Sequence, residues 1–173
     1  HLSLRRQRQM CIRDRPYPRP DSATGVCFMD GAVSSLWSDK GLSKQVNRAT
    51  SLRNFMKMLL VADGQLSIEQ TTGDALAGVS LKAQAAPTKV IQTLPELQDK
   101  LTQHGFLLLN ASLVFRAHVA PVKDAKAWLP FLQTVLAALA DHAQQVGQTA
   151  PTLVLWGKIA AVSYTHLTLP TKA

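Results

Sequence analysis

Two short apolar runs, at residues 106–109 and 152–156, constrain the fold of this chain more than any other feature. Each run is too short for a helix and has the continuous apolar character of a strand buried on both faces of a parallel sheet. Between them, starting near Asp124, lies a long segment with helical periodicity. A strand, a helix and a strand with short connections form a βαβ unit, so the sequence predicts an α/β fold with a parallel sheet. The apolar positions of the helix are Trp128, Phe131, Leu132, Val135, Leu136 and Leu139.

Two more helices are expected before this unit. Ser51 can cap a helix, because apolar residues follow it at helical spacing. Thr93 and Glu96 form a capping-box pattern, and that helix should end near Gly105. Residues 64–90 are rich in Gly, Thr, Ala and Gln and only weakly periodic, so we expect a loop with short pieces of structure. The apolar positions after Ser51 are Leu52, Phe55, Met56, Leu59 and Leu60.

The two ends of the chain can be encoded by complementary DNA strands. Residues 10–14 can be written ATG TGT ATA AGA GAC, and the reverse complement of this DNA encodes residues 162–166. The agreement extends over ten consecutive codons, which pair residues 5–14 with residues 162–171. The DNA also resembles the transposase end and adapter used to fragment genomes for sequencing. We therefore interpret residues 1–15 and 162–173 as translated adapter without a biological role.

Removing these ends changes the charge of the chain. The sequence has nineteen Lys and Arg residues and eleven acidic residues, for a formal net charge of +8. Six of the basic residues and one acid lie in the ends, which leaves thirteen against ten and a net charge of about +3. Bulk charge then no longer argues for a nucleic-acid partner. Cys27 is the one remaining cysteine, and no apolar run approaches the roughly 20 residues that span a bilayer, so we expect a cytoplasmic protein.

Asn110 directly follows the first apolar run. In open α/β sheets ligands lie beyond the carboxyl ends of the strands, which here are Asn110 and residues 156–157. The amide of Asn110 is therefore well placed to bind a ligand. The alternative is that it only satisfies nearby backbone at the strand end, and both interpretations stay open on the pattern alone.

Residues 16–28 read Pro-Tyr-Pro-Arg-Pro-Asp-Ser-Ala-Thr-Gly-Val-Cys-Phe. This segment resembles, without gaps, the water-activating loop of the uracil-DNA glycosylase family: Pro-Tyr-His-Gly-Pro, two residues, Ala-His-Gly, an apolar residue, Ala or Cys, then Phe. In the family's order, residues 50–54 are similar to its Pro-Ser-Leu-Lys-Asn loop and residues 107–110 to its Leu-Leu-Leu-Asn strand end. Residues 155–157 with Ala160 are similar to its Leu-Trp-Gly segment, and the region of Trp128 to the helix between the last two.

The resemblance implies a role for four residues. Phe28 would stack on the flipped uracil, and Asn110 would hydrogen-bond the uracil edge and reject cytosine. Tyr17 would stand against C5 of the base, where the methyl group of thymine would collide. Ser51 would hold a DNA phosphate at a helix N-terminus. Taken singly, Tyr17 and Phe28 can also be core aromatics, and Ser51 can be only a helix cap.

Several positions depart from the family. Its loop has an Asp immediately before Pro16, where this chain has Arg15, and Asp14 is one position out of register. Pro18 and Thr24 replace its two loop histidines. Its His-Pro-Ser loop should lie beyond Ala161 and is absent, and none of the remaining histidines sits in such a motif: His104 and His142 are expected on helix surfaces, and His118 has no expected place. We therefore assign no catalytic residue to the chain and no metal site.

Together these observations predict that residues 16–161 are a fragment of a uracil-DNA glycosylase-like domain. We expect a three-layer α/β/α sandwich with a short, mainly parallel central sheet that is incomplete at both ends. The parent would be a DNA-repair enzyme that hydrolyses the N-glycosidic bond of uracil in DNA without a cofactor, as a monomer that binds uracil-containing DNA and no membrane. This chain itself would be inactive. The alternatives are a non-catalytic nucleic-acid-binding or interaction domain on the same scaffold and an unrelated α/β enzyme.

Overall fold

The structure, a computed structural model, describes residues 9–13 and 18–157. The chain forms two compact units, one of His1–Cys27 with Leu101–Ala173 and the other of Phe28–Lys100. Each unit is described by itself below. Tyr17, one of the residues predicted to contact the base, lies outside the described residues, as do Pro16 and Ala160.

The first unit contains a parallel sheet of three strands in the order β4-β1-β5. β4 spans Phe106–Asn110 and β5 spans Thr152–Trp156, so both predicted strands are confirmed. β1, Gln9–Arg13, lies between them and pairs in parallel with each. The prediction that both apolar runs are buried on two faces is wrong. They form the outer strands of the described sheet, where Leu107 is exposed and most of β5 is only half-buried.

The central strand β1 comes from the N-terminal run that we interpret as translated adapter. The backbone of Cys11 pairs with Leu108 on one side and with Val154 on the other. This pairing gives residues 9–13 a structural place that the sequence did not predict. The structure does not test whether the codons of residues 9–13 come from a sequencing adapter, so that interpretation stays a prediction.

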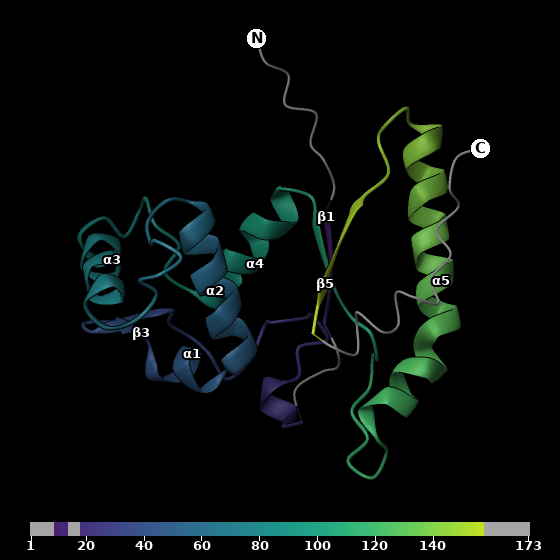
Figure 1. Cartoon of the computed structure of the whole chain (residues 1–173), viewed down its shortest axis with the longest axis horizontal. Helices are drawn as coiled ribbons and strands as arrows, with labels where there is room; N and C mark the ends of the chain where they lie inside the picture. The colour runs from purple at the N-terminus through teal and green to yellow at the C-terminus, as the bar shows by residue number, and fades with distance from the viewer. Residues whose placement is uncertain (1–8, 14–17, 158–173) are drawn as a thin grey trace. The chain divides into compact units, whose positions relative to one another are not determined.

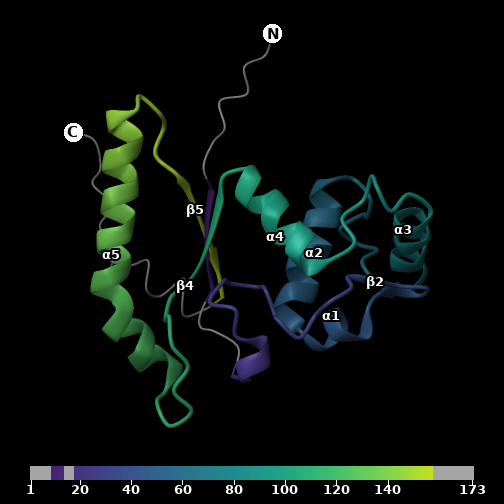
Figure 2. The same cartoon turned by 180° about the vertical axis from the view of Figure 1, so that it is seen from behind.

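Helix α5, Pro121–Gln145, connects β4 to β5 and runs alongside the sheet (Figure 1). It begins at Pro121 rather than near Asp124, because the fixed φ of proline suits the first helical turn. Its apolar stripe packs against side chains of both outer strands, and Figure 2 gives the same arrangement from behind. The predicted crossover is thereby confirmed. The core of this unit consists of Ala111, Ala125, Leu132 and Leu136, with Leu109, Leu129, Val135, Leu139, Leu153 and Leu155 packed against them.

The second unit combines a small hairpin with helices. Strands β2, Trp37–Ser38, and β3, Gly41–Leu42, pair antiparallel, and helix α3, Gly73–Ala85, lies against them. Helix α1, Lys44–Arg48, leads through Ala49 into helix α2, Thr50–Ala62.

Two predictions about this unit need correction. Residues 64–90 were expected to be mainly loop, yet they contain the thirteen-residue helix α3. Its buried positions Leu76, Val79, Ser80 and Ala83 have helical spacing, but its many small residues give little contrast between faces. Ser51 is not the cap of α2: the helix begins at Thr50 after Ala49, and no side chain caps it. The serine that does cap a helix is Ser43, whose Oγ accepts from the Val46 amide of α1 at 3.2 Å.

Helix α4, Leu94–Gln103, follows the predicted Thr93 start and ends before Gly105. The Glu96 amide donates to Thr93 Oγ1 at 3.4 Å, as in a capping box, but the Glu96 carboxylate accepts from the Gln92 amide at 2.8 Å rather than from Thr93. The segment before α4 is tied to the hairpin, since Trp37 Nε1 donates to the Ile91 carbonyl at 2.8 Å. The structure thus confirms an α/β fold, and the three-layer arrangement of the sandwich stays a prediction.

Candidate functional site

Asn110 is the last residue of β4, at the carboxyl end of a parallel strand. The residue is 1% exposed, and its Oδ1 has no hydrogen-bond partner among the described residues. A buried amide oxygen without a partner costs free energy, and such groups in folded proteins require an explanation. The alternative in which Asn110 only satisfies nearby backbone does not account for this oxygen. An ordered water or a ligand that donates a hydrogen bond at the strand end would satisfy it.

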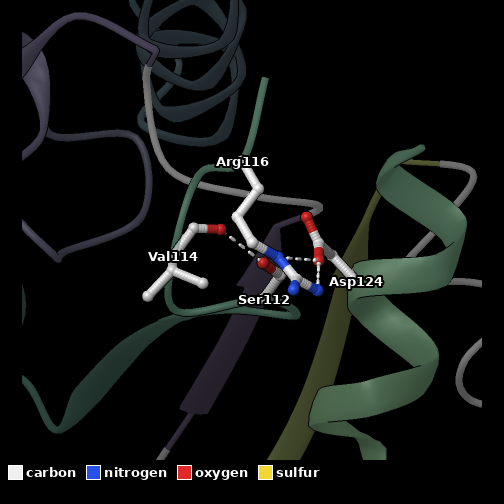
Figure 3. Close-up of polar contacts among 4 residues, drawn as sticks. All are labelled: Ser112, Val114, Arg116 and Asp124. Carbon is white, nitrogen blue, oxygen red and sulfur yellow. Dashed lines mark hydrogen bonds and ion pairs between the residues drawn. The ribbon is translucent and has the colours of Figure 1, made fainter. Parts of the chain in front are cut away.

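The segment after Asn110 is held in place by two sets of polar contacts (Figure 3). Ser112 Oγ donates to the Val114 carbonyl at 2.7 Å. Arg116 donates from Nε to Asp124 Oδ1 at 2.8 Å and also from Nη2 to the same oxygen. The Asp124 side chain is 2% exposed, whereas that of Arg116 is 47% exposed. The carboxylate is therefore buried with an arginine that reaches it from the surface.

This ion pair joins the β4–α5 connection to the first turn of α5. Asp124 lies in that first turn, where the helix dipole favours a negative charge. Ala125 beside it belongs to the core that packs on the sheet. The pair thus anchors the six residues after Asn110 to the same core that β4 packs on. From the sequence, Asp124 was expected only as a helix start and Arg116 had no expected role, because a spacing of eight residues across a loop has no regular period.

Phe28 is the first residue of the second unit and is fully buried. Its ring stacks on that of Phe55 of α2, with centroids 4.4 Å apart and an interplanar angle of 2°. Its φ is +65°, the only positive φ of a non-glycine residue in the described part of the chain. A bulky residue in this region carries backbone strain, which proteins retain where the surroundings or the function require it. A core aromatic explains the burial but gives no reason for the strain.

Asp30 is a buried carboxylate that the sequence analysis did not single out. Its Oδ1 accepts from the Ala32 amide at 3.0 Å, and its carbonyl accepts from the Val33 amide at 2.9 Å. These bonds close a turn of residues 30–33, which begins two residues after Phe28 and is an ordinary use of Asp.

Ser51 is half-buried in the first turn of α2. Because it does not cap the helix, the cap explanation for this residue is wrong, and the phosphate-binding prediction is left untested. The first-turn amides of a helix point out of its N-terminus and favour an anion.

The remaining predicted positions have simpler surroundings. His142 is exposed on α5, as predicted, whereas His104 is exposed in the turn just after α4 rather than on the helix, and His118 is exposed in the β4–α5 connection. In the loop of residues 18–27, Ser22 is buried and its Oγ has no partner within the described part of the chain. Asn110 belongs to one unit and Phe28 and Ser51 to the other. That Tyr17, Phe28 and Asn110 line one cleft stays a prediction.

Comparisons with known proteins place this geometry in context. No family model and no curated protein matches the chain. Two solved structures do: the wild-type UNG crystal structure from Nitratifractor salsuginis, at 31% identity and a TM-score of 0.66, and a mutant of that UNG, at 30% identity and a TM-score of 0.60. Each match covers 90% of this chain, which spans 66% of the matched chain. The similarity supports a uracil-DNA glycosylase-like fold.

Proposed function

We propose, with the uracil-DNA glycosylase-like fold as the premise, that this chain is part of a DNA-repair enzyme that hydrolyses the N-glycosidic bond of uracil in DNA. The observation that carries the proposal is the buried amide oxygen of Asn110, which lacks a partner among the described residues at the carboxyl end of β4. A base with an N–H next to a carbonyl complements a carboxamide, which has one acceptor and one donor group. Uracil presents this edge.

Asn110 would supply the discrimination against cytosine. Cytosine has an exocyclic amine where uracil has a carbonyl, and an unprotonated ring nitrogen where uracil has an N–H. In the same orientation the two hydrogen bonds would therefore be replaced by a donor–donor and an acceptor–acceptor contact. A site that pairs a polar edge inside a buried pocket rejects the wrong partner strongly, because the unpaired group has no water to bind. The ion pair of Arg116 and Asp124 would keep the segment after Asn110 in one position.

Phe28 would stack on the extruded base, with Phe55 supporting the ring from its other side. Its strained backbone is consistent with a ring held in one orientation for a ligand. Tyr17 would exclude the thymine methyl, and Ser51 would contact a DNA phosphate from the first turn of α2. These roles rest on the family resemblance.

Catalysis would need a carboxylate to orient water and stabilise an oxocarbenium-like sugar. The position immediately before Pro16 is Arg15, a cation, which would repel that developing positive charge. We therefore propose that this chain binds uracil-containing DNA but does not cleave the bond. Free uracil released from a uracil-containing oligonucleotide, above a control without protein, would contradict this part.

Discrimination of uracil from the other bases, which we call base reading, can be tested by binding alone, without cleavage of the glycosidic bond. Fluorescence anisotropy would compare matched oligonucleotides that carry a single uracil, thymine or cytosine, with the full chain at low salt. We expect the uracil oligonucleotide to bind at least about tenfold more tightly than the others, equivalent to about 1.4 kcal/mol. Asn110→Leu should remove this preference while general DNA binding persists.

The matched control is Gln144→Leu, at an exposed amide side chain of α5. It should leave the preference for uracil unchanged. Equal affinity of the parent chain for all three oligonucleotides would refute base reading.

A non-catalytic DNA-binding domain on the same scaffold is the second candidate. Arg15, Pro18 and Thr24 favour it, because each replaces a polar group of the family's water-activating loop. Substituting all three with the family's Asp and His separates the two. Uracil release by that variant would favour a disabled enzyme over the binding domain. We further propose that the protein is a cytoplasmic monomer. In the described part of the chain, no helix combines the length and apolar character that membrane crossing requires.

A further inference from the structure

The two consecutive helices α1 and α2 carry four basic residues and no acidic one. These are Lys44, Arg48, Arg53 and Lys57, and we call them the α1–α2 basic surface. Lys44 and Arg48 are exposed, and Arg53 and Lys57 are half-buried. Removing the terminal runs lowers the charge of the chain, but it leaves this surface unchanged.

The basic residues are aligned in pairs. Lys44 and Arg48 are four residues apart on α1, and Arg53 and Lys57 are four apart on α2, so each pair shares a helix face. Like charges at this spacing destabilise a helix by about 0.2–0.5 kcal/mol. No acidic side chain of either helix offsets the repulsion, whereas a bound polyanion would.

Arg53 brings the two pairs together. Its Nη1 donates to the carbonyl of Asn47 at 3.1 Å, which places the guanidinium of Arg53 at the last turn of α1. Asn47 is the residue immediately before Arg48. Its Nε also donates to Asn54 Oδ1 at 3.5 Å, so the guanidinium is held from both helices. The cation at the junction is therefore positioned before any ligand arrives.

The neighbouring exposed side chains indicate the kind of partner. Gln45, Asn47, Thr50 and Asn54 are exposed beside the cations and are polar, and Met58, at 38%, is the one exposed large apolar side chain of the two helices. A surface that binds lipid interleaves cations with apolar or aromatic side chains. Amides and hydroxyls among cations are instead typical of contacts to phosphate and sugar oxygens.

We propose that the α1–α2 basic surface binds the phosphate backbone of DNA, with Lys44 and Arg48 each neutralising one phosphate. The proposal rests on the proposed function and deepens it, because it names side chains that hold the duplex outside the base-reading residues. Lys44, Arg48 and Lys57 lie in none of the segments that carry the resemblance to the glycosylase family.

The test measures the salt dependence of binding of the full chain to a labelled duplex that contains only the four ordinary bases. The double variant Lys44→Gln/Arg48→Gln removes two exposed charges. The matched control Lys82→Gln/Lys89→Gln removes two exposed charges from another part of the same unit. All variants carry Arg5→Gln, Arg6→Gln and Arg8→Gln, so that the basic N-terminal run does not dominate binding.

The two double variants should differ in the slope of log affinity against log salt. Each phosphate contact contributes about 0.9 to that slope, so loss of Lys44 and Arg48 should make it shallower by about 1.8. The control should keep the slope of its parent. Equal slopes for both double variants would overturn the inference, as would stronger binding to anionic phospholipid vesicles than to DNA.

This outcome is distinguishable from failure of the proposed function. A chain that binds DNA through this surface but shows no preference for uracil would refute the base reading and keep the backbone contact. If the chain prefers uracil but the Lys44→Gln/Arg48→Gln variant keeps the salt dependence of its parent, the base reading stands and the backbone contact is refuted.

Discussion

At the scale of single residues, two of the positions predicted to contact the base, Phe28 and Asn110, carry a strained backbone or an unsatisfied buried group, and within the described part of the chain Ser22 Oγ is a further unsatisfied buried group outside that set. Phe28 combines a positive φ with a ring stacked on Phe55, and Asn110 combines burial with an amide oxygen that lacks a described partner. The positive φ of Phe28 and the unpaired oxygen of Asn110 each lower the stability of the folded chain. Strain and unpaired polar groups that persist in a folded protein are reasons to propose a function at those residues.

The substitution Asn110→Leu tests this cost directly. Leucine has similar branching and no polar atom, so it removes the unpaired buried acceptor. We expect the free energy of unfolding in urea to stay within about 1 kcal/mol of the parent or to rise. If Oδ1 were satisfied in the folded protein, the same change would cost about 1–3 kcal/mol, and a loss at the upper end of that range would contradict the prediction.

The ion pair of Arg116 and Asp124 should respond asymmetrically. Arg116→Ala leaves the buried Asp124 carboxylate without its partner, whereas Asp124→Ala leaves a half-exposed arginine that can reach water. Removing one partner of a fully buried pair costs about 3–5 kcal/mol, and we expect Arg116→Ala to approach that range. Asp124→Ala should cost clearly less, as measured by denaturant unfolding. Equal losses would show that burial of the carboxylate does not control the energetics.

At the scale of elements, the hairpin of β2 and β3 is fitted closely to α3. Gly41 has a φ of +122°, and a Cβ built on it would lie 3.1 Å from Leu76 Cβ of α3. Only glycine combines this backbone conformation with so close an approach. This contact packs the hairpin against α3, a helix that its own sequence predicts only weakly.

Two glycine substitutions in this region should have opposite effects. Gly41→Ala should destabilise the chain by about 1–3 kcal/mol, because both φ and the contact with Leu76 become unfavourable. Gly78→Ala, inside α3, should stabilise it by about 0.4–1 kcal/mol, because apart from the helix's own backbone and the two chain neighbours no atom lies within 4 Å of the added Cβ. Thermal unfolding of the two variants provides the comparison. A loss of stability in Gly78→Ala would mean that the helix packs more tightly there.

At the scale of the whole molecule, each unit has its own core, and the central strand of the first unit comes from the run interpreted as adapter. β4 and β5 each pair with β1, so they have no hydrogen-bonded contact with each other within the described sheet. Any chain that lacks β1 would expose the inner edges of both strands, and unpaired edges destabilise a sheet.

Deletion of residues 1–13 should therefore unfold the first unit selectively. We expect amide hydrogen exchange to show loss of protection in β4 and β5, while α2 and α3 of the second unit stay protected. Deletion of residues 1–8 alone, which retains β1, is the control and should preserve protection in both units. Unchanged protection of β4 and β5 without residues 1–13 would support the interpretation that the N-terminal run has no structural role.

The sequence by itself determined the local and periodic features. The apolar runs predicted β4 and β5, the amphipathic stripe predicted α5, and the Thr93 pattern predicted the start of α4. These follow from side-chain spacing within one segment, which the sequence contains directly. The position of Asn110 at a strand end follows for the same reason.

Only the tertiary structure decided the features that join distant segments. These are β1 at the centre of the sheet, the stack of Phe28 on Phe55, the pair of Arg116 and Asp124, and the burial that makes α3 a stable helix. Each depends on contacts between residues without a fixed spacing, and on burial, which sets the cost of an unpaired amide or carboxylate. The sequence identified Asn110 as a candidate ligand-binding residue. Only the structure shows that its side chain is buried and that Oδ1 lacks a hydrogen-bond partner among the described residues, which gives a ligand that donates a hydrogen bond a reason to bind there.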